Sequence, residues 1–290
     1  MHSFANIALR SRRILVVALA AIAFFHAAQA APRQPRLHRN QIPFAGTPAQ
    51  PLVLDASYPI TGDSVPAVIV VHGGGWEAGD RRTYVNPLLA LLEDSGYAWF
   101  SIDHRLAPAH PYPAALEDVQ AAIAWVHAHA GEFHIDPNRI VLAGESSGGH
   151  LVSLAGALDE ARLSGVVSFY GIHNFENWLA VDGAVRKNAG QFLGVSRIDD
   201  FTLPRIRAAS PVNHVHPAMP PYFLIHGEAD GGVPLAQSEE MCRAMRKARA
   251  TCELFVLPGA GHGMENWERE PALHVWKAQF LAWLNRLWGM

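Results

Sequence analysis

Ile140-Val141-Leu142-Ala143-Gly144-Glu145-Ser146-Ser147-Gly148-Gly149-His150 is the stretch that decides the fold. Its first four residues are apolar and rich in β-branched types, which predicts a buried strand, and residues 150–158 predict a helix. The pattern G-x-S-x-G lies between them. A sharp turn from strand to helix strains the backbone of the central residue and requires small residues two positions before and after it. We therefore expect Ser146 to present its hydroxyl at a strand end, beside a helix N-terminus.

The alternation of strand and helix continues on both sides of this stretch. Helices are predicted at residues 87–93, 236–249 and 273–287, and the apolar spacing of residues 116–126 indicates a helix lying on a sheet. Short apolar runs predict further strands at residues 52–56 (as an edge strand), 65–71, 97–102, 166–170, 222–225 and 254–257. Such an order is typical of an α/β fold with a mostly parallel sheet and helices on both faces.

We expect one folded domain, residues 51–290 of the 290 in the chain. Residues 31–50 are rich in Pro, Gln, Arg and Asn and are expected to form a flexible leader outside the fold. Residues 171–220 are too many for a simple connection, which favours a small lid or pocket wall. Its large apolar side chains either line a substrate pocket or form the insertion's own core; they are Phe175, Trp178, Phe192, Leu193 and Phe201.

The N-terminus has the pattern of an export signal. Three arginines, the last at Arg13, precede an apolar run over residues 14–25, and Ala28-Gln29-Ala30 follows. This pattern predicts a signal peptide, residues 1–30, cleaved after Ala30, and a secreted or periplasmic protein. The run is shorter than the about 20 residues that a membrane span needs, so no stable membrane anchor is expected. Residues 11–15 loosely resemble a twin-arginine signal, and the general secretory route is favoured over it.

The two cysteines, Cys242 and Cys252, are ten positions apart. In an exported protein they are expected either to form a disulfide between a helix and the next strand or to remain buried thiols.

Composition excludes several classes of partner and site. The net charge is −3 and no basic stripe occurs, so no nucleic-acid partner is expected. The pairs His127/His129 and His214/His216 are spaced i, i+2, and H-E-x-x-H is absent, so we expect no metal site. No cofactor is implied, and the sequence leaves the oligomeric state open.

Two further residues follow predicted strands and have side chains of the types that could activate the Ser146 hydroxyl. A serine hydroxyl needs a base to remove its proton, and the base needs an acid partner that holds its orientation. His262 lies in a glycine-rich loop after residues 254–257, and Asp230 follows residues 222–225, with Glu228 and Asp103 as competing acids. Because parallel strands end at one edge of a sheet, we expect Ser146, Asp230 and His262 to converge there.

Donors for the oxyanion of such a reaction are expected from a second motif, His72-Gly73-Gly74-Gly75-Trp76. Glycines expose backbone amides, and Gly74, Gly75 and Ser147 are the predicted donors. The run lacks the Lys and Ser/Thr of a phosphate-binding loop, which disfavours that alternative. Trp76 and Glu145, adjacent to these motifs, are candidate substrate-binding residues.

Three stretches together resemble a known superfamily. They are residues 72–76, residues 144–150 and Asp103-His104-Arg105-Leu106-Ala107-Pro108-Ala109-His110-Pro111-Tyr112-Pro113-Ala114-Ala115. They look like the α/β-hydrolase esterases, in particular the feruloyl-esterase-like (BD-FAE-type) carbohydrate esterases and the hormone-sensitive-lipase-like esterases. The short polar leader and the acid segment Ala229-Asp230-Gly231-Gly232-Val233-Pro234 favour the former group.

The resemblance implies a serine carboxylic-ester hydrolase with Ser146 as nucleophile, His262 as base and Asp230 as acid. The expected substrates are short-chain esters, or small-molecule aryl or carbohydrate-linked esters. An amide-cleaving relative, such as an arylformamidase or a peptidase, and a non-catalytic binding protein of the same fold remain alternatives.

Overall fold

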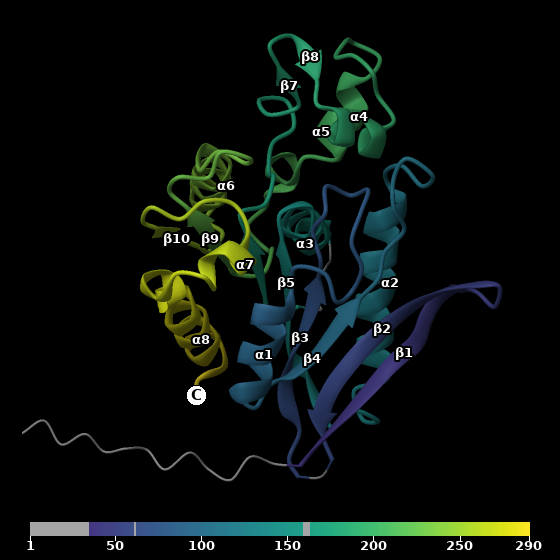
Figure 1. Cartoon of the computed structure of the whole chain (residues 1–290), viewed down its shortest axis with the longest axis vertical. Helices are drawn as coiled ribbons and strands as arrows, with labels where there is room; N and C mark the ends of the chain where they lie inside the picture. The colour runs from purple at the N-terminus through teal and green to yellow at the C-terminus, as the bar shows by residue number, and fades with distance from the viewer. Residues whose placement is uncertain (1–34, 61, 159–162) are drawn as a thin grey trace, which may run out of the picture. The chain divides into compact units, whose positions relative to one another are not determined.

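The computed structural model describes residues 35–60, 62–158 and 163–290, which belong to one compact unit (Figure 1). The expected signal peptide, residues 1–30, lies outside the described residues. The strands are β1 Arg36–Thr47, β2 Gln50–Pro59, β3 Val65–Val71, β4 Ala98–Ile102, β5 Ile135–Glu145, β6 Gly165–Phe169, β7 Ala180–Val181, β8 Ala184–Val185, β9 Tyr222–Gly227 and β10 Cys252–Leu257. The helices are α1 Asn86–Asp94, α2 Ala114–Ala128, α3 Ser147–Leu158, α4 Lys187–Leu193, α5 Leu203–Ala208, η1 Pro211–His214, α6 Ala236–Lys247, α7 Met264–Trp267, η2 Pro271–His274 and α8 Val275–Trp288.

In the described part of the chain, eight strands form one sheet in the order β1-β2-β4-β3-β5-β6-β9-β10. The six strands from β4 to β10 in this order are mutually parallel. Strand β2 pairs antiparallel with β4, and β1 pairs antiparallel with β2. The mostly parallel sheet expected from the sequence is therefore confirmed. The parallel strands all end at one edge, where the motifs of the sequence meet.

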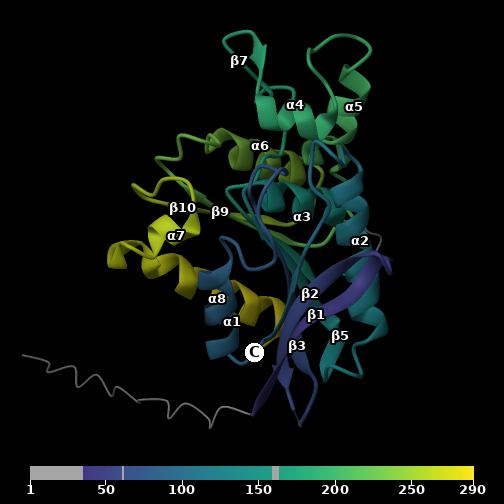
Figure 2. The same cartoon turned by 45° about the vertical axis from the view of Figure 1, so that its right-hand side comes forward.

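Helices cover both faces of the sheet, because its central strands are apolar on both sides. In β3, Ile69 and Val71 belong to the core beneath α2, α3 and α6, while Val68 and Val70 belong to the core beneath α1 and α8. Figures 1 and 2 show α2 and α1 on opposite sides of the sheet. Among the described residues, no helix is both long and apolar enough to cross a membrane.

The structure corrects two expectations near the N-terminus. The described part of the segment expected to be a flexible leader contains β1, which pairs with β2 from Arg36↔Pro59 to Thr47↔Gln50. Strand β2 is consequently not an edge strand, since it lies between β1 and β4. The polarity that suggested a leader belongs to an edge strand, where exposed charged side chains such as Arg39 discourage pairing with another chain.

The insertion between β6 and β9 has its own secondary structure. It contains the hairpin of β7 and β8, the helices α4 and α5, and η1. Figure 2 shows β7, α4 and α5 beyond the end of the sheet at which the parallel strands finish. This position is the one expected of a wall over a site at the strand ends.

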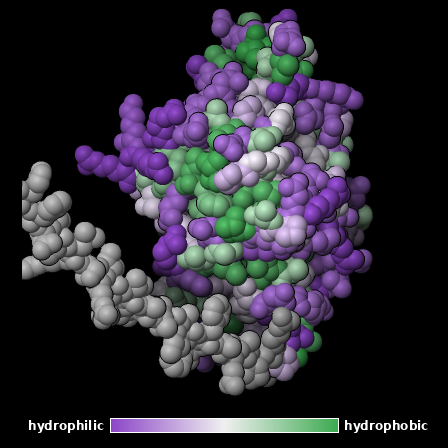
Figure 3. Space-filling model, turned by 60° about the vertical axis from the view of Figure 1, so that its left-hand side comes forward, coloured by the Kyte–Doolittle hydropathy of each residue, from purple (hydrophilic) through white to green (hydrophobic). Residues whose placement is uncertain are grey.

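The other edge of the sheet differs from the β1 edge. Figure 3 turns forward the face that carries α6, α7, α8 and β10, and hydrophobic side chains gather in its middle. In β10, Leu254, Phe255 and Val256 are half-buried rather than buried. The strand is therefore apolar and, within the described chain, has a neighbour on one side only.

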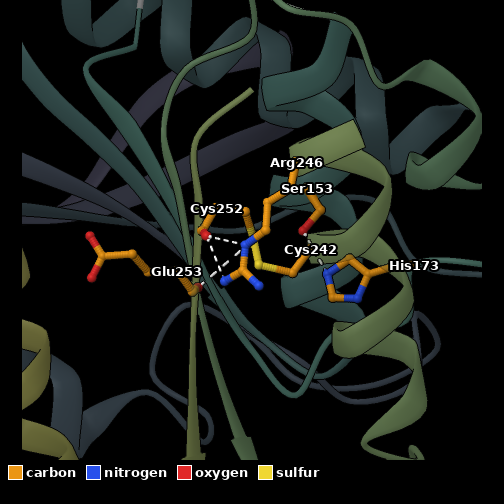
Figure 4. Close-up of a disulfide and its surroundings, with 6 residues drawn as sticks. All are labelled: Ser153, His173, Cys242, Arg246, Cys252 and Glu253. Atoms are coloured by element: carbon orange, nitrogen blue, oxygen red, sulfur yellow. Dashed lines mark hydrogen bonds between the residues drawn. A yellow bond between two sulfur atoms is a disulfide. The ribbon is translucent and has the colours of Figure 1, made fainter. Parts of the chain in front are cut away.

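Cys242 of α6 and Cys252 of β10 form a disulfide, with their Cα atoms 5.3 Å apart (Figure 4). Nearby, the Arg246 guanidinium donates hydrogen bonds to the Cys252 carbonyl at 3.0 and 3.2 Å. Of the two alternatives left by the sequence, the structure selects the disulfide. It ties α6 to the edge strand that follows it in the chain.

Replacing both cysteines by serine should lower the free energy of unfolding by about 2–3 kcal/mol, because the cross-link restricts a short loop of the unfolded chain. Chemical denaturation of the oxidised protein and of the Cys242→Ser/Cys252→Ser variant measures the difference. Dithiothreitol should destabilise the wild-type protein similarly and leave the variant unchanged. Equal stability of the oxidised protein and the variant would contradict the expectation.

Candidate active site

Ser146 occupies the turn between β5, which ends at Glu145, and α3, which begins at Ser147. Its φ of 54° lies in the left-handed region, the strained conformation expected at this position. The flanking glycines are required by the geometry, because a Cβ on Gly144 would lie 2.5 Å from the Gly148 carbonyl oxygen. The turn predicted from G-x-S-x-G is therefore present, with the serine at its apex.

The structure brings Ser146, His262 and Asp230 together. Ser146 Oγ lies 2.9 Å from His262 Nε2, and His262 Nδ1 lies 2.7 Å from Asp230 Oδ2. The other carboxylate oxygen of Asp230 accepts the N–H groups of Gly232 and Val233 at 2.8 and 2.9 Å. Asp230 is thus fixed by its own loop, and it fixes one nitrogen of the imidazole so that the other faces the serine.

Burial acts on Asp230 to raise its pKa, but the hydrogen bond and charge of His262 and the two backbone amides act against burial, and the pKa is lowered. Asp230 therefore remains a carboxylate at neutral pH. A carboxylate at this position favours a proton on the adjacent Nδ1, which leaves Nε2 free to accept one from Ser146.

The competing acids have other partners. Asp103 accepts the Arg81 backbone N–H at 2.9 Å, and its other oxygen lies 2.9 Å from the Arg81 guanidinium. Glu228 accepts the N–H of Gly259 at 3.1 Å. Within the described residues, neither of these carboxylates forms a hydrogen bond with His262, whereas Asp230 does.

The three predicted oxyanion donors lie around the serine hydroxyl. Gly74, Gly75 and Ser147 line the same cavity as Ser146. Within the described residues, the amides of Gly74 and Gly75 donate to no protein acceptor, and Ser147 begins α3, where first-turn amides have no partner inside the helix. At Gly74, φ is 103° and a Cβ would lie 2.1 Å from the Ala78 carbonyl oxygen, so no other residue fits.

Glu145 links the two motifs that form this site. Its Oε1 accepts the N–H of Gly73 at 2.6 Å, and only 4% of the residue is exposed. Burial raises its pKa from the ordinary 4.5 to about 7, although the nearby His262 and the Gly73 hydrogen bond act in the opposite direction. Tyr170, a further hydrogen-bond partner of Glu145, accepts the N–H of Met264 at 2.7 Å. Glu145 thus lies between the glycine loop and the loop after His262.

A cavity of about 500 Å³ lies over Ser146. Trp76 and Glu145, the two candidate substrate-binding residues, both line it but are almost fully buried. Trp76 stacks on Phe192, with ring centroids 4.8 Å apart, and its Nε1 donates to His150 Nδ1 at 3.1 Å. Most of its ring is therefore packed in the protein core.

The five large apolar side chains of the insertion do not form a core of their own: one lines the cavity, three join the main core of the fold, and one is exposed to solvent. Trp178 lines the cavity, Phe175, Phe192 and Leu193 belong to the core, and Phe201 is 89% exposed. The sequence analysis missed Arg186, Asn188 and Tyr84, which also line the cavity. No motif or helical period covers these three positions. Tyr170 was within reach, since it is the last residue of the strand predicted at residues 166–170 and therefore lies at a strand end.

Within residues 35–60, 62–158 and 163–290, no three His, Cys, Asp or Glu side chains are grouped to hold a metal ion. The arrangement described above places a serine hydroxyl, an imidazole with a carboxylate partner, and backbone amides on one cavity. It can support acyl transfer from an ester or a related carbonyl compound by groups of the protein itself.

Comparison with known proteins agrees with this geometry. The sequence model of the BD-FAE family matches residues 54–245. Esterase LipC of Mycobacterium tuberculosis is 32% identical over 243 residues, which are 79% of this chain and 60% of LipC. Esterase LipQ of the same organism is 34% identical over 218 residues, 70% of this chain and 51% of LipQ. The chain thus spans little more than half the length of these curated relatives.

Solved structures show the same fold. A truncated carbohydrate esterase from gut microbiota has a TM-score of 0.75 at 24% identity, and the alignment covers 89% of this chain and 98% of that one. An acetyl ester-xyloside bifunctional hydrolase from Caldicellulosiruptor lactoaceticus has a TM-score of 0.73 at 25% identity, with the same coverage. The α/β-hydrolase fold expected from the motifs is confirmed.

Glu145→Gln should make stability less dependent on pH. Because the pKa of Glu145 is higher in the folded than in the unfolded chain, its stabilising contribution is present below about pH 4.5 and is lost as the pH rises through about 7. At pH 8 the buried charge costs about 3 kcal/mol, which glutamine avoids while still accepting the Gly73 N–H. The Tm difference between variant and wild type should therefore grow by several degrees from pH 5 to pH 8.

Thermal unfolding at both pH values measures this difference. Glu265→Gln is the matched control, because Glu265 lines the same cavity but is exposed. A Tm difference that is the same at both pH values would show that the Glu145 carboxyl is not perturbed by burial.

Proposed function

Because the chain belongs to the BD-FAE family, we propose that it is a carboxylic-ester hydrolase that forms an acyl-enzyme on Ser146. The observation that carries this proposal is the chain of contacts from Ser146 Oγ to His262 Nε2 at 2.9 Å and from His262 Nδ1 to Asp230 at 2.7 Å. LipC and LipQ, which are named esterases, support the same reaction class.

In the first half of the proposed reaction, Ser146 Oγ attacks the ester carbonyl carbon while His262 Nε2 takes the hydroxyl proton. Negative charge develops on the carbonyl oxygen and is stabilised by the amides of Gly74, Gly75 and Ser147. The ester C–O bond then breaks, and His262 returns the proton to the leaving alcohol.

In the second half, a water molecule gives its proton to His262 and attacks the acyl carbon. The bond to Ser146 Oγ breaks, the serine recovers a proton from His262, and the free acid leaves. Asp230 holds the imidazole in one orientation through both halves and stabilises its positive charge.

For the substrate we propose short-chain, aryl or carbohydrate-linked esters. The cavity of about 500 Å³ has the size of a small-molecule site, and its lining includes the aromatic side chains Trp178 and Tyr84. Two structural neighbours support the carbohydrate-linked class, since one is a carbohydrate esterase and the other an acetyl ester-xyloside bifunctional hydrolase.

We also propose that the protein is exported to the periplasm or the medium and is cleaved after Ala30. The apolar run behind Arg10, Arg12 and Arg13 is the basis of this proposal. The disulfide between Cys242 and Cys252 supports it, since such bonds persist in oxidising compartments.

Ser146→Ala should lower ester turnover by roughly 10⁴–10⁶-fold and leave the fold intact, because the hydroxyl is used only in the chemical step. Ser196→Ala is a matched control, since Ser196 is exposed in the insertion and does not line the cavity. The assay compares acetyl, butyryl, octanoyl and feruloyl esters with a formyl amide and a peptide amide. Ester turnover by Ser146→Ala close to the wild-type rate would remove Ser146 as the nucleophile, and Ser146-dependent cleavage of amides alone would select an amidase.

Expression of the whole chain in a bacterial host should give a periplasmic or extracellular protein that begins at Ala31. Intact-mass analysis and N-terminal sequencing of each cell fraction measure the cleavage site. A deletion of residues 14–25 is the control and should keep the protein in the cytoplasm. An uncleaved wild-type protein found only in the cytoplasm would refute the export proposal.

A further inference from the structure

The insertion contributes one cation to the cavity above Ser146, the half-buried guanidinium of Arg186. We propose that Arg186 and Trp178 form a subsite for a carboxylate group of the ester substrate, so that the protein prefers esters with an anionic acyl or alcohol part. This inference rests on the proposed esterase function and deepens it by naming a substrate class.

The guanidinium of Arg186 is held in a fixed place. Its Cζ lies 4.6 Å from the centre of the Trp178 ring, and its Nε donates to the Trp178 carbonyl oxygen at 2.8 Å. The Arg186 backbone N–H also donates to the carbonyl of Leu179 at 2.8 Å. Because stacking and hydrogen bonding already restrict the Arg186 side chain, this side chain loses little additional conformational freedom when a ligand binds to it.

Trp178, on which the guanidinium stacks, is itself fixed. Only 6% of it is exposed, and its Nε1 donates to the Gly232 carbonyl at 3.3 Å. Gly232 in turn donates its N–H to Asp230, the acid partner of His262. The position of the guanidinium relative to Ser146 is therefore set through the same loop that positions the imidazole.

The remaining nitrogens of Arg186 are available to a ligand. In the described chain, Nη1 and Nη2 bond to no protein acceptor and no carboxylate pairs with Arg186. Other arginines of the insertion do have anionic partners, as in Arg197–Asp199 and Arg207–Glu176. A planar guanidinium with free terminal nitrogens matches the two oxygens of a carboxylate.

The other charges around the cavity leave this role to Arg186. Among the described lining residues it is the only arginine or lysine. Glu145 is engaged with the Gly73 amide, and Glu265, in the first turn of α7, is exposed, so that solvent screens its charge. Among the described lining residues, the half-buried guanidinium of Arg186 is therefore the arginine or lysine charge that an anionic substituent meets.

The subsite and the reacting atoms share one cavity, since Arg186 and Trp178 line it together with Ser146 and His262. Asn188, two residues after Arg186, lies against Gly75, since a Cβ on that glycine would be 2.8 Å from Asn188 Nδ2. The Cα atom of Arg186 lies at most about 7 Å from that of Asn188, because two residues of extended chain span no more than this. A carboxylate carried by a single aromatic ring is a substituent that fits a cavity of about 500 Å³, and it is the kind that we expect Arg186 to recognise.

The test uses two pairs of esters in which a carboxylate is replaced by a carboxamide of the same shape. The acyl pair is 4-nitrophenyl 4-carboxybenzoate and 4-nitrophenyl 4-carbamoylbenzoate, and the alcohol pair is 4-carboxyphenyl acetate and 4-carbamoylphenyl acetate. In one pair, the ratio of kcat/KM for the anionic over the neutral ester should fall about tenfold in Arg186→Gln, mainly through KM. Arg186→Lys should keep part of the preference, and rising salt should reduce the ratio of the wild-type protein. The pair that responds shows whether the subsite serves the acyl or the alcohol group.

Arg197→Gln is the matched control, because Arg197 lies in the same insertion, pairs with Asp199 and does not line the cavity. Its ratios should stay within about twofold of wild type. A purely structural effect of Arg186→Gln would lower kcat/KM equally for both members of a pair. Ratios unchanged by Arg186→Gln in both pairs, with turnover that still requires Ser146, would overturn this inference and leave the proposed function standing.

A binding measurement does not depend on turnover. Calorimetric titration of Ser146→Ala with benzoate and with benzamide should give a preference for benzoate that is lost in Ser146→Ala/Arg186→Gln. Equal benzoate affinity of the two variants would refute the subsite even if no ester in the panel is hydrolysed. Absence of all Ser146-dependent turnover together with Arg186-dependent benzoate binding would instead refute the esterase proposal alone.

Discussion

The close contact between the start of α3 and the end of β3 is the constraint on which the site depends. A Cβ on Gly148 would lie 2.3 Å from the Val71 carbonyl oxygen and 2.4 Å from that of His72. Only glycine allows the helix to start this close to the neighbouring strand, and the approach holds Ser146 in its left-handed conformation. It also brings Ser147 beside the glycine loop that follows β3, so the same backbone contact positions the proposed nucleophile and the proposed oxyanion donors.

Glu145 also stabilises the contact between the end of β3 and the start of α3. A Cβ on Gly73 would lie 2.0 Å from Glu145 Oε1, so the carboxyl group fills the space that a side chain on the loop would need. A buried acidic side chain is costly unless its oxygens are hydrogen-bonded, and here a backbone amide and Tyr170 provide partners. The glutamate of G-E-S-S-G thus connects loops that are distant in sequence.

Much of the central sheet and of the serine's surroundings was predictable because the informative residues are local to strand ends. Ser146, Asp230 and His262 each follow an apolar run, and the geometry of a parallel sheet brings such positions to one edge. The strand β1 was not predictable from periodicity, since an edge strand such as residues 36–47 exposes both faces and its polarity resembles that of a leader. The role proposed for Arg186 was hidden for another reason. It depends on the stacking of Arg186 on Trp178 and on the contact of Trp178 with Gly232, and no local sequence pattern encodes these tertiary contacts.

The distances in sequence between the site residues have a consequence for how the chain acquires its chemistry. Ser146 and His262 are 116 positions apart, and they meet only because β5, β6, β9 and β10 lie side by side. Contacts of such high sequence separation form late and slowly in folding. In the proposed mechanism, a nascent or unfolded chain therefore carries the serine without its base, and it should not react with esters before the last parallel strand docks. Because of the order of the strands along the chain, Ser146 is synthesised well before the proposed active site can assemble.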